Sequence, residues 1–243
     1  MSTKNRIRLF SNASLKKGEP YICTPPQVHY LQNVMRKNVG DTVFLFDGKN
    51  GEFEGVITQI SKKSIMIDVQ KKVFDFNASP DVWLLFAPLK KENTDIIVQK
   101  AVELGVSGLL PVKTEYTFIS KINIERIQSQ VIEAAEQSRR QDLPVIYPLA
   151  DLQNVLLSWD KTRKLIYLDE TGAGLTFAAQ SQFMDAPVAF LIGPEGGFSK
   201  KELEILKNMS YTVGISLGRR ILRSETAAIA ALSCWQAMRG DWK

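Results

Sequence analysis

The chain has 243 residues, of which 44% are apolar and 23% charged; this is the composition of a globular protein and excludes intrinsic disorder, a collagen-like chain and a disulfide scaffold. The net charge of +5 is unevenly distributed, because residues 1–72 hold 12 Lys and Arg against 6 Asp and Glu, whereas residues 73–243 hold 19 against 20. A basic excess confined to the first third favours a nucleic acid partner over an anionic membrane, since no basic amphipathic helix with a broad apolar face is visible.

The first third of the chain is predicted to form a small antiparallel sheet or barrel, preceded by one short helix at Val28–Lys37. The strands are expected at Val43–Phe46, Glu52–Ile60 and Ser64–Val69. Between the first two strands, Asp47-Gly48-Lys49-Asn50-Gly51 supplies turn residues that tolerate positive φ. Short strands joined by tight turns indicate a separate β domain over residues 1–72, followed by a linker over residues 73–80.

From residue 81 onward, continuous apolar runs alternate with helical patterns. Buried strands are predicted at Val82–Ala87, Ser107–Val112, Leu165–Leu168, Val188–Ile192 and Tyr211–Leu217. Helices are predicted at Asn93–Leu104, Asn123–Arg140, Ser199–Met209 and Ser224–Arg239. Ser199 and Glu202 form a capping box, and Gly105 follows the first of these helices as its C′ residue. The alternation predicts an α/β domain with a mainly parallel sheet over residues 81–243.

The scarcity of histidine and cysteine excludes several kinds of catalytic site. His29 is the one histidine, and Cys23 and Cys234 are the only cysteines. A His-rich or Cys-based zinc site is therefore excluded, and a Ser-His-Asp triad would have to use His29, which is more simply explained as a partly exposed helix residue. Two cysteines fit free thiols in a reducing cytosol. Since no apolar run reaches the ~18 residues of a membrane span and no secretory signal is visible, we expect a cytoplasmic protein without a membrane partner.

A glycine-containing loop at a predicted strand end is the first candidate binding site. Leu191-Ile192-Gly193-Pro194-Glu195-Gly196-Gly197-Phe198 follows a buried strand and precedes a capped helix. Ligands of parallel α/β sheets bind at the carboxyl ends of the strands, where glycines let backbone N–H groups approach a ligand closely. A tight turn without a ligand is the alternative. The loop is not G-x-x-x-x-G-K-[ST], which argues against a nucleotide hydrolase.

A second loop, Leu217-Gly218-Arg219-Arg220-Ile221-Leu222-Arg223-Ser224-Glu225-Thr226-Ala227, also joins a strand to a helix, with Ser224 as the predicted N-cap. Three arginines and a glutamate at the mouth of a parallel sheet favour function over a merely solvated loop. Leu168-Asp169-Glu170, with Gly172 and Gly174, is a weaker third segment whose spacing does not match a dinucleotide fingerprint. An ordinary Rossmann methyltransferase is disfavoured because no glycine-rich turn follows an early strand.

The two loops together resemble the paired signature of the SPOUT methyltransferases, G-P-E-G-G-F-[ST]-x-x-E at Gly193–Glu202 and L-G-x-R-I-L-R-x-E-T-A at Leu217–Ala227. The chain is most similar to the bacterial members that methylate N3 of a uridine in 16S ribosomal RNA. The resemblance covers nearly the whole chain and includes His29-Tyr30-Leu31…Val34-Met35-Arg36, Asp95–Pro111 and Glu133–Arg140.

The resemblance implies a trefoil-knotted α/β SPOUT methyltransferase domain, preceded by a small PUA-like β-barrel that binds RNA. It also implies a homodimer, S-adenosylmethionine as cofactor without a metal, and 16S rRNA or the assembled small ribosomal subunit as partner. The Ser224–Arg239 helix is a candidate dimer interface, because Ala227, Ala228, Ala230 and Ala231 allow close approach. The cofactor-binding residues that the resemblance implies are Leu168, Ile192, Gly193, Glu195, Gly197, Leu217, Gly218, Ile221, Leu222, Arg223 and Thr226. The RNA-binding residues are expected to be Arg8, His29, Arg36, Lys37, Arg139 and Arg140.

Methyl transfer from a sulfonium to a ring nitrogen requires alignment, loss of the N3 proton and stabilisation of charge on the uracil oxygens. We expect Arg223 to stabilise that charge and Glu225 or Glu195 to accept the proton or orient its acceptor. An equally good explanation for a glutamate at position 225 is that it caps the start of the helix and complements the helix dipole. Two other functions stay open, namely a SPOUT ribose 2′-O-methyltransferase and a non-catalytic RNA-binding protein in which the glycine loops are plain turns.

Overall fold

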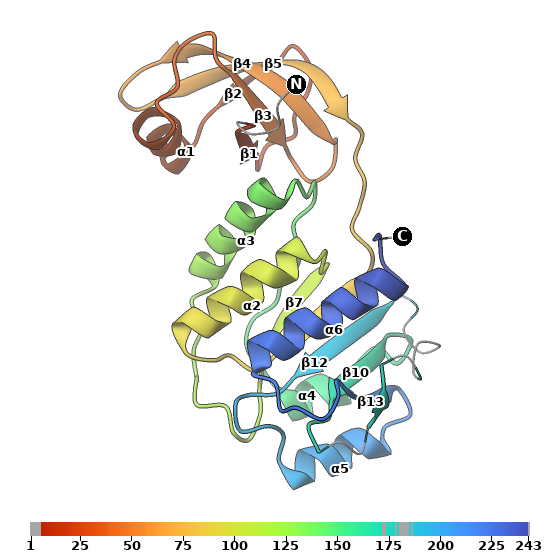
Figure 1. The fold of residues 1–243 in the computed structure, drawn as a ribbon. Helices are drawn as coiled ribbons and strands as arrows, with labels where there is room; N and C mark the ends of the chain where they lie inside the picture. The colour runs from red at the N-terminus through yellow and green to blue at the C-terminus, as the bar shows by residue number, and fades with distance from the viewer. Residues whose placement is uncertain (1–5, 172–173, 178, 180–184, 186, 243) are drawn as a thin grey trace. The chain divides into compact units, whose positions relative to one another are not determined.

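The computed structural model describes residues 6–171, 174–177, 179, 185 and 187–242, and the chain divides into two compact units (Figure 1). The first unit comprises Met1–Ala78 together with Ala135–Leu143, and the second comprises Ser79–Ala134 together with Pro144–Lys243. No helix within the described residues is long and apolar enough to cross a membrane.

The first unit is built on a five-stranded sheet in the order β1-β3-β4-β5-β2. Strand β1 pairs parallel to β3, and the other neighbours pair antiparallel. The elements are β1 (Arg8–Phe10), β2 (Pro20–Ile22), α1 (Pro25–His29), the π-helix η2 (Tyr30–Val34), β3 (Thr42–Phe46), β4 (Glu52–Ile60) and β5 (Ile65–Phe74). The three predicted strands are confirmed as β3, β4 and β5. Strands β1 and β2 were not predicted, because three residues are too few to show an alternating pattern.

The helical segment of this unit differs from the prediction of one helix at Val28–Lys37. It begins earlier because Pro25 and Pro26 occupy the first helical positions, where a missing N–H costs nothing. Gln27 Oε1 accepts a hydrogen bond from the backbone N–H of Thr24 at 3.0 Å, as in a capping box. The segment then continues as η2, so an α-helical turn and a π-helical turn follow one another.

The predicted turn between β3 and β4 forms around the carboxylate of Asp47. Its Oδ1 accepts the backbone N–H groups of Lys49 and Asn50 at 3.0 and 2.8 Å. Burial raises the pKa of Asp47, but hydrogen bonds from Leu15, Asn50 and Lys49 outweigh burial and hold the pKa below its ordinary value. The turn also needs glycine at its end, because Gly51 has φ 93°.

Arg8 is a buried arginine that ties β1 to β4 and to the end of α3 (Ile124–Ser138). Its Nε donates to Glu52 Oε2 at 2.9 Å, and the guanidinium also donates to the backbone oxygens of Ala135 and Arg140 at 2.7 and 2.9 Å. Carbonyls at the end of a helix lack intrahelical donors, and the guanidinium supplies them. Burial lowers the pKa of Arg8, and the Glu52 carboxylate opposes that shift. The expectation that Arg8 binds RNA is therefore corrected, since its donors are engaged inside the unit.

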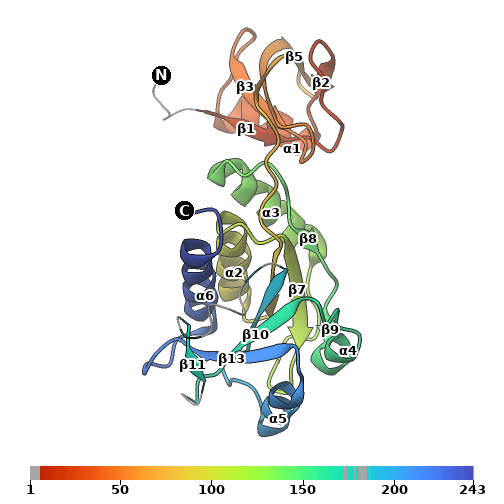
Figure 2. The same ribbon diagram turned by 90° about the vertical axis from the view of Figure 1, so that its right-hand side faces the viewer.

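The second unit is built on a parallel sheet in the order β11-β13-β10-β12-β6-β7-β8, with β9 paired to β7. Its strands are β6 (Val82–Phe86), β7 (Gly108–Lys113), β8 (Val145–Ile146), β9 (Ala150–Asp151), β10 (Lys164–Leu168), β11 (Leu175–Thr176), β12 (Val188–Ile192) and β13 (Thr212–Ser216). Its helices are α2 (Lys91–Glu103), α4 (Leu152–Leu157), α5 (Lys200–Asn208), α6 (Ser224–Met238) and the part of α3 that precedes Ala135, since the end of α3 belongs to the first unit. Helices α2 and α6 lie side by side on one face of the sheet, and α4 and α5 lie on the other (Figures 1 and 2).

The predicted alternation of strands and helices, and the parallel sheet, are confirmed. The capping box of α5 forms as expected, with Ser199 Oγ accepting from the Glu202 N–H at 3.2 Å and Glu202 Oε2 accepting from the Ser199 N–H at 2.9 Å. Gly105 follows α2 with φ 78°. Strands β8, β9 and β11 were missed because two residues carry no periodic signal. Both cysteines are free, with Cys23 buried and Cys234 exposed.

Replacing Arg8 with alanine is expected to destabilise the protein by about 1–3 kcal/mol, because the buried carbonyls at the end of α3 lose their donors while the Glu52 carboxylate keeps Arg6 as its charge partner. The measurement is the midpoint of urea unfolding, followed by circular dichroism. Lys16→Ala is the control, since it removes only an exposed ion pair with Glu19. Equal midpoints for the two variants would contradict the structural role of Arg8.

Candidate active site

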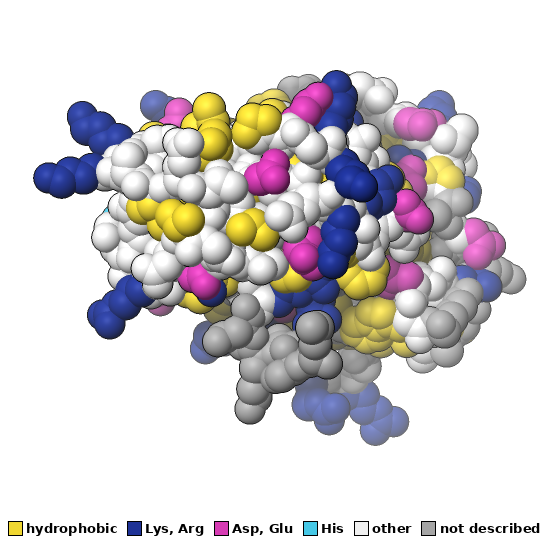
Figure 3. Space-filling view, turned by 90° about the horizontal axis from the view of Figure 1, so that it is seen from above, with side chains coloured by type: hydrophobic (Ala, Val, Ile, Leu, Met, Phe, Trp, Pro, Cys, Tyr) yellow, Lys and Arg dark blue, Asp and Glu magenta, His cyan; other side chains and the backbone are white. Residues whose placement is uncertain are grey.

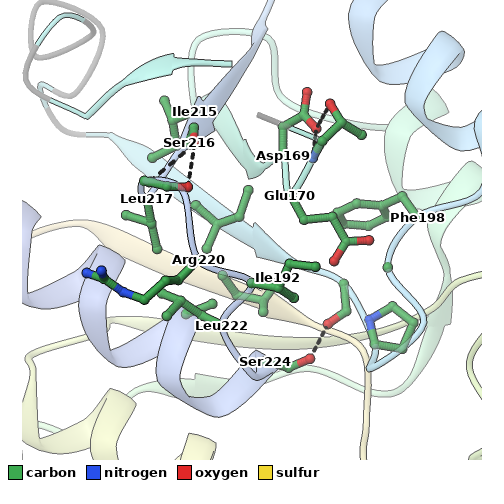
Figure 4. A pocket seen from close by; sticks show the side chains of 18 of the residues that line it. Asp169, Glu170, Ile192, Phe198, Ile215, Ser216, Leu217, Arg220, Leu222 and Ser224 are labelled. Atoms are coloured by element: carbon green, nitrogen blue, oxygen red, sulfur yellow. Dashed lines mark hydrogen bonds between the residues drawn. The ribbon is translucent and has the colours of Figure 1, made fainter. Parts of the chain in front are cut away.

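A pocket opens at the carboxyl ends of β10, β12 and β13, which are neighbours in the sheet (Figure 4). Leu168–Thr171 lines it after β10, and residues from Ile192 to Phe198 line it after β12. Residues from Ile215 to Leu222 line it at the end of β13, and Leu203 of α5 and Ala227 of α6 complete the wall. Because parallel strands place all their carboxyl ends at one edge, segments far apart in the sequence meet there.

The glycine loop after β12 makes a tight turn beside the pocket. The N–H of Gly197 donates to the backbone oxygen of Pro194 at 2.9 Å, which leaves Glu195 and Gly196 at the exposed tip. Gly197 is buried with φ 69°. A Cβ at this position would collide with the carboxylate of Glu170. The positive φ is therefore the main reason for glycine at position 197, because the exposed and flexible Glu170 side chain is able to move away from a Cβ.

Two hydrogen bonds shape the arginine loop after β13. Ser224 Oγ donates to the backbone oxygen of Gly193 at 2.9 Å and so joins the two loops. Ser224 was expected to be the N-cap of α6, but the N-cap is Arg223 and the serine hydroxyl is engaged in this contact instead. Gly218, with φ 106°, donates its N–H to Ser216 Oγ at 3.3 Å. The side chain of Arg220 lies on the side of the pocket away from Asp169 and Glu170 (Figure 4).

Two carboxylates lie at the end of β10. Asp169 is buried, and its Oδ1 accepts hydrogen bonds from Thr171 N and Oγ1 at 2.9 and 2.6 Å. Burial, together with the charge of Asp169, raises the pKa of the neighbouring Tyr167. Glu170 is exposed and extends toward Phe198 in the close view (Figure 4). The pocket thus combines an apolar lining with negative groups on one side and an arginine on the other, a combination suited to a ligand with both apolar and charged parts.

The pocket brings together most of the predicted cofactor-binding residues. Those that line it are Leu168, Ile192, Gly193, Gly197, Leu217, Gly218, Ile221 and Leu222. Glu195, Arg223 and Thr226 are exposed and do not line it. The other lining residues were not named as cofactor-binding, but most lie in the three segments singled out from the sequence, namely Asp169, Glu170, Pro194, Phe198, Arg220, Ser224 and Ala227. The pocket lining outside those segments is Thr171, Leu203, Ile215 and Ser216, and three of these four lie within one or two residues of a segment. Gly172 lies outside the described residues.

The three candidate catalytic residues occupy different environments. Glu195 is exposed at the tip of the glycine turn, and Arg223 is exposed at the start of α6. Glu225, in the first turn of α6, is half-buried, and its Oε2 is buried without a hydrogen-bond partner among the described residues. A buried acceptor without a donor is costly, which sets Glu225 apart from the two exposed candidates, although none of the three lines the pocket.

The candidate RNA-binding residues belong to the first unit. Arg36 and Arg139 are exposed, and both adopt positive φ, at 51° and 63°. Positive φ is uncommon for a residue other than glycine and is found often at functional positions. His29 is exposed, with Nδ1 2.8 Å from Asn33 Nδ2. Figure 3 shows a face of the molecule from which Lys and Arg side chains project, with Asp and Glu among them.

Two further candidates are engaged within the first unit. Arg140 is buried, and its Nε donates to Asp142 Oδ1 at 2.8 Å. Lys37 is half-buried, and its Nζ lies 3.8 Å from Asp41 Oδ2. Arg140, like Arg8, is therefore less available to a phosphate than its position in the sequence suggested, because burial and an ion pair hold the guanidinium.

Two protein families match the chain, and they fall on different parts of it. Residues 77–236 match the RNA methyltransferase domain, and residues 24–70 match the RNA methyltransferase PUA domain. Ribosomal RNA small subunit methyltransferase E of Buchnera aphidicola subsp. Schizaphis graminum is 32% identical, over 98% of this chain and 99% of that protein. The protein of the same name from Rickettsia conorii is 30% identical over 93% of each chain.

Solved structures resemble the chain over nearly its full length. The Ribosomal RNA small subunit methyltransferase E of Neisseria gonorrhoeae, bound to S-adenosyl methionine, has a TM-score of 0.90 at 26% identity and covers 98% of this chain and 100% of its own. A putative methyltransferase from Legionella pneumophila, in complex with the bound cofactor SAM, has a TM-score of 0.87 at 30% identity and covers 98% of this chain and 99% of its own. With a pocket at the strand ends of its parallel sheet and likeness along its whole length, the chain belongs to the RNA methyltransferase family that includes the ribosomal RNA small subunit methyltransferases E.

Proposed function

We propose that this chain transfers the methyl group of S-adenosylmethionine to N3 of a uridine in the 16S RNA of the small ribosomal subunit. The pocket at the ends of β10, β12 and β13 carries the proposal, because it joins the glycine loop and the arginine loop around one space. The names of the relatives supply the class of RNA, and the two structural neighbours are complexes with this cofactor.

The residues of the pocket fit S-adenosylmethionine. Leu168, Ile192 and Leu222 offer an apolar lining for the adenine ring. The carboxylates of Asp169 and Glu170 suit ribose hydroxyls or the ammonium group. The turn at Gly197, which a Cβ would fill, lets the backbone approach the ligand. When bound, this cofactor supplies a methyl group on a sulfonium.

The chain's own residues then have three tasks, namely to align the uracil, to remove the N3 proton and to stabilise the resulting charge. Alignment alone contributes as much as roughly 7–11 kcal/mol. Glu225 accepts the N3 proton, because its Oε2 is a buried acceptor without a donor within the described residues. Arg223, next to Glu225 at the start of α6, stabilises the negative charge that spreads onto O2 and O4. Glu195, at the turn tip, orients the proton acceptor.

We further infer a trefoil-knotted path in the second unit and a homodimer. The knot is supported by the sheet order, in which β10 lies between β12 and β13, and by the bond from Ser224 to Gly193 that joins the loops of these strands. For the dimer, Ala227 and Ala230 of α6 are half-buried and allow close approach of a second copy. Ala228 and Ala231 are buried inside the unit and do not contribute.

Replacing Gly197 with valine is expected to abolish binding of S-adenosylmethionine while the protein stays folded, because the side chain would strain a backbone at φ 69° and displace Glu170. Isothermal calorimetry with S-adenosylmethionine measures the loss. Gly196→Ala is the matched control, since a Cβ there meets Tyr116 at an ordinary 3.5 Å. Unchanged affinity in Gly197→Val would overturn the cofactor assignment.

Arg223→Ala is expected to slow methylation by about 10²–10³-fold, the usual effect of removing one group that stabilises developing charge. The single-turnover rate should be measured at saturating RNA and cofactor, so that weaker binding does not contribute. Arg219→Ala, at an exposed arginine of the same loop, is the control. A normal rate in Arg223→Ala would show that Arg223 is only a loop residue.

Arg36→Ala is expected to weaken RNA binding and to reduce the slope of log affinity against log salt by about 1, as for one lost phosphate contact. Affinity for S-adenosylmethionine should stay unchanged, because the pocket belongs to the second unit. The control is Lys71→Ala, whose ammonium is already paired with Glu54 at 3.3 Å. An unchanged salt slope together with weaker cofactor binding would mean that RNA binding and cofactor binding are assigned to the wrong units.

A further inference from the structure

Two aromatic side chains stand on the loop after β7, outside the pocket lining. The loop turns between Thr114 and Thr117, whose hydroxyl oxygens are 2.8 Å apart, and the N–H of Thr117 donates to Thr114 O at 3.2 Å. Both threonines are buried. Tyr116, in this turn, is 43% exposed, and Phe118, directly after it, is 99% exposed.

This loop is anchored beside the pocket. The buried carboxylate of Glu202 accepts the N–H of Glu115 through Oε1 at 2.8 Å, while its Oε2 accepts the N–H of Ser199. Tyr116 lies against the glycine turn, since a Cβ added at Gly196 would be 3.5 Å from the Cβ of Tyr116. The hydrogen bonds and this contact hold the segment that carries Phe118 next to the turn that lines the pocket.

Exposure alone does not identify a function for Phe118, because single exposed apolar side chains are ordinary. Its surroundings are more informative. Lys113, the last residue of β7, and Lys121, on the loop after it, are exposed, and neither has an ion-pair partner among the described residues. The arginine loop at the pocket adds Arg220, and Glu115 is the one acidic residue between the two lysines. Aromatic faces with cations nearby are the pattern that binds unpaired RNA, because bases stack on the rings and phosphates contact the cations.

We propose that Phe118, supported by Tyr116, stacks against an unpaired base of the substrate RNA next to the target uridine, while Lys113 and Lys121 contact the flanking phosphates. The proposal rests on the proposed function in that it takes RNA as the substrate. It goes further because it gives the second unit its own RNA-binding surface, in addition to the exposed arginines of the first. Phe118 is a positioning residue, and its loss raises the KM for RNA without affecting the cofactor.

The experiment compares Phe118→Ala, Phe118→Leu and Phe118→Trp in the full chain. Leu157→Ala is the matched control, because Leu157 is 82% exposed on α4 and has no role in the proposal. The substrate is small ribosomal subunits from cells that lack this modification. Alanine and leucine are expected to raise the KM for subunits by about 5- to 150-fold, the effect of losing one stacked base, whereas tryptophan retains wild-type behaviour. Affinity for S-adenosylmethionine should be the same in all four variants.

Three results would overturn the proposal that Phe118 stacks on an RNA base. Phe118→Ala could match Leu157→Ala, which would mean that Phe118 does not contact RNA. Phe118→Leu could match wild type, which would show an apolar contact rather than stacking. A changed mass in sedimentation for Phe118→Ala would place Phe118 between two copies of the chain. If the wild-type protein methylates no uridine, the proposed function fails on its own. The affinity of the same variants for a short oligouridylate then tests whether Phe118 stacks on a base.

Discussion

The parallel direction of β10, β12 and β13 is the constraint on which the rest of the site depends. Each strand runs the same way as its neighbours, so Leu168, Ile192 and Ser216 end their strands at one edge of the sheet. Parallel strands need long crossover connections, and therefore the glycine loop and the arginine loop are separated in the sequence by α5 and β13. An antiparallel neighbour would deliver one of these loops to the opposite edge, and no common pocket would form.

A few polar contacts then hold the loops in place at that edge. Ser224 joins the arginine loop to the glycine loop through Gly193, at the cost of its expected place as a helix cap. Glu202 caps α5 through Ser199 and also holds Glu115 of the loop after β7. Because the same carboxylate orders a helix start and a second loop, the aromatic side chains beside the pocket are positioned by the same element as the glycine turn. The cofactor pocket and the proposed RNA-stacking side chains therefore lie on loops that meet at Glu202.

The first unit shows why counting charges along the sequence is an incomplete guide to an RNA surface. Arg8 contributes to the basic excess, yet it is buried against Glu52 and the end of α3 and serves stability. Arg36 and Arg139 are exposed instead, each in a backbone conformation that glycine usually occupies. A net charge supports attraction to a polyanion, but the fold decides which cations remain free to meet it.

The sequence by itself determined the α/β class, the parallel sheet, the three strands of the β unit, the capping box at Ser199 and the three segments that line the pocket, of which Leu168-Asp169-Glu170 gave the weakest signal. These follow from hydrophobic periodicity, glycine placement and capping chemistry, which are local properties of the chain. Only the tertiary structure decided that Ser224 bonds to Gly193, that Asp169 is buried in the pocket and that Ala135–Leu143 belongs to the first unit. Such features are contacts between segments distant in the sequence, and no local pattern of residues specifies which distant partner a side chain will meet.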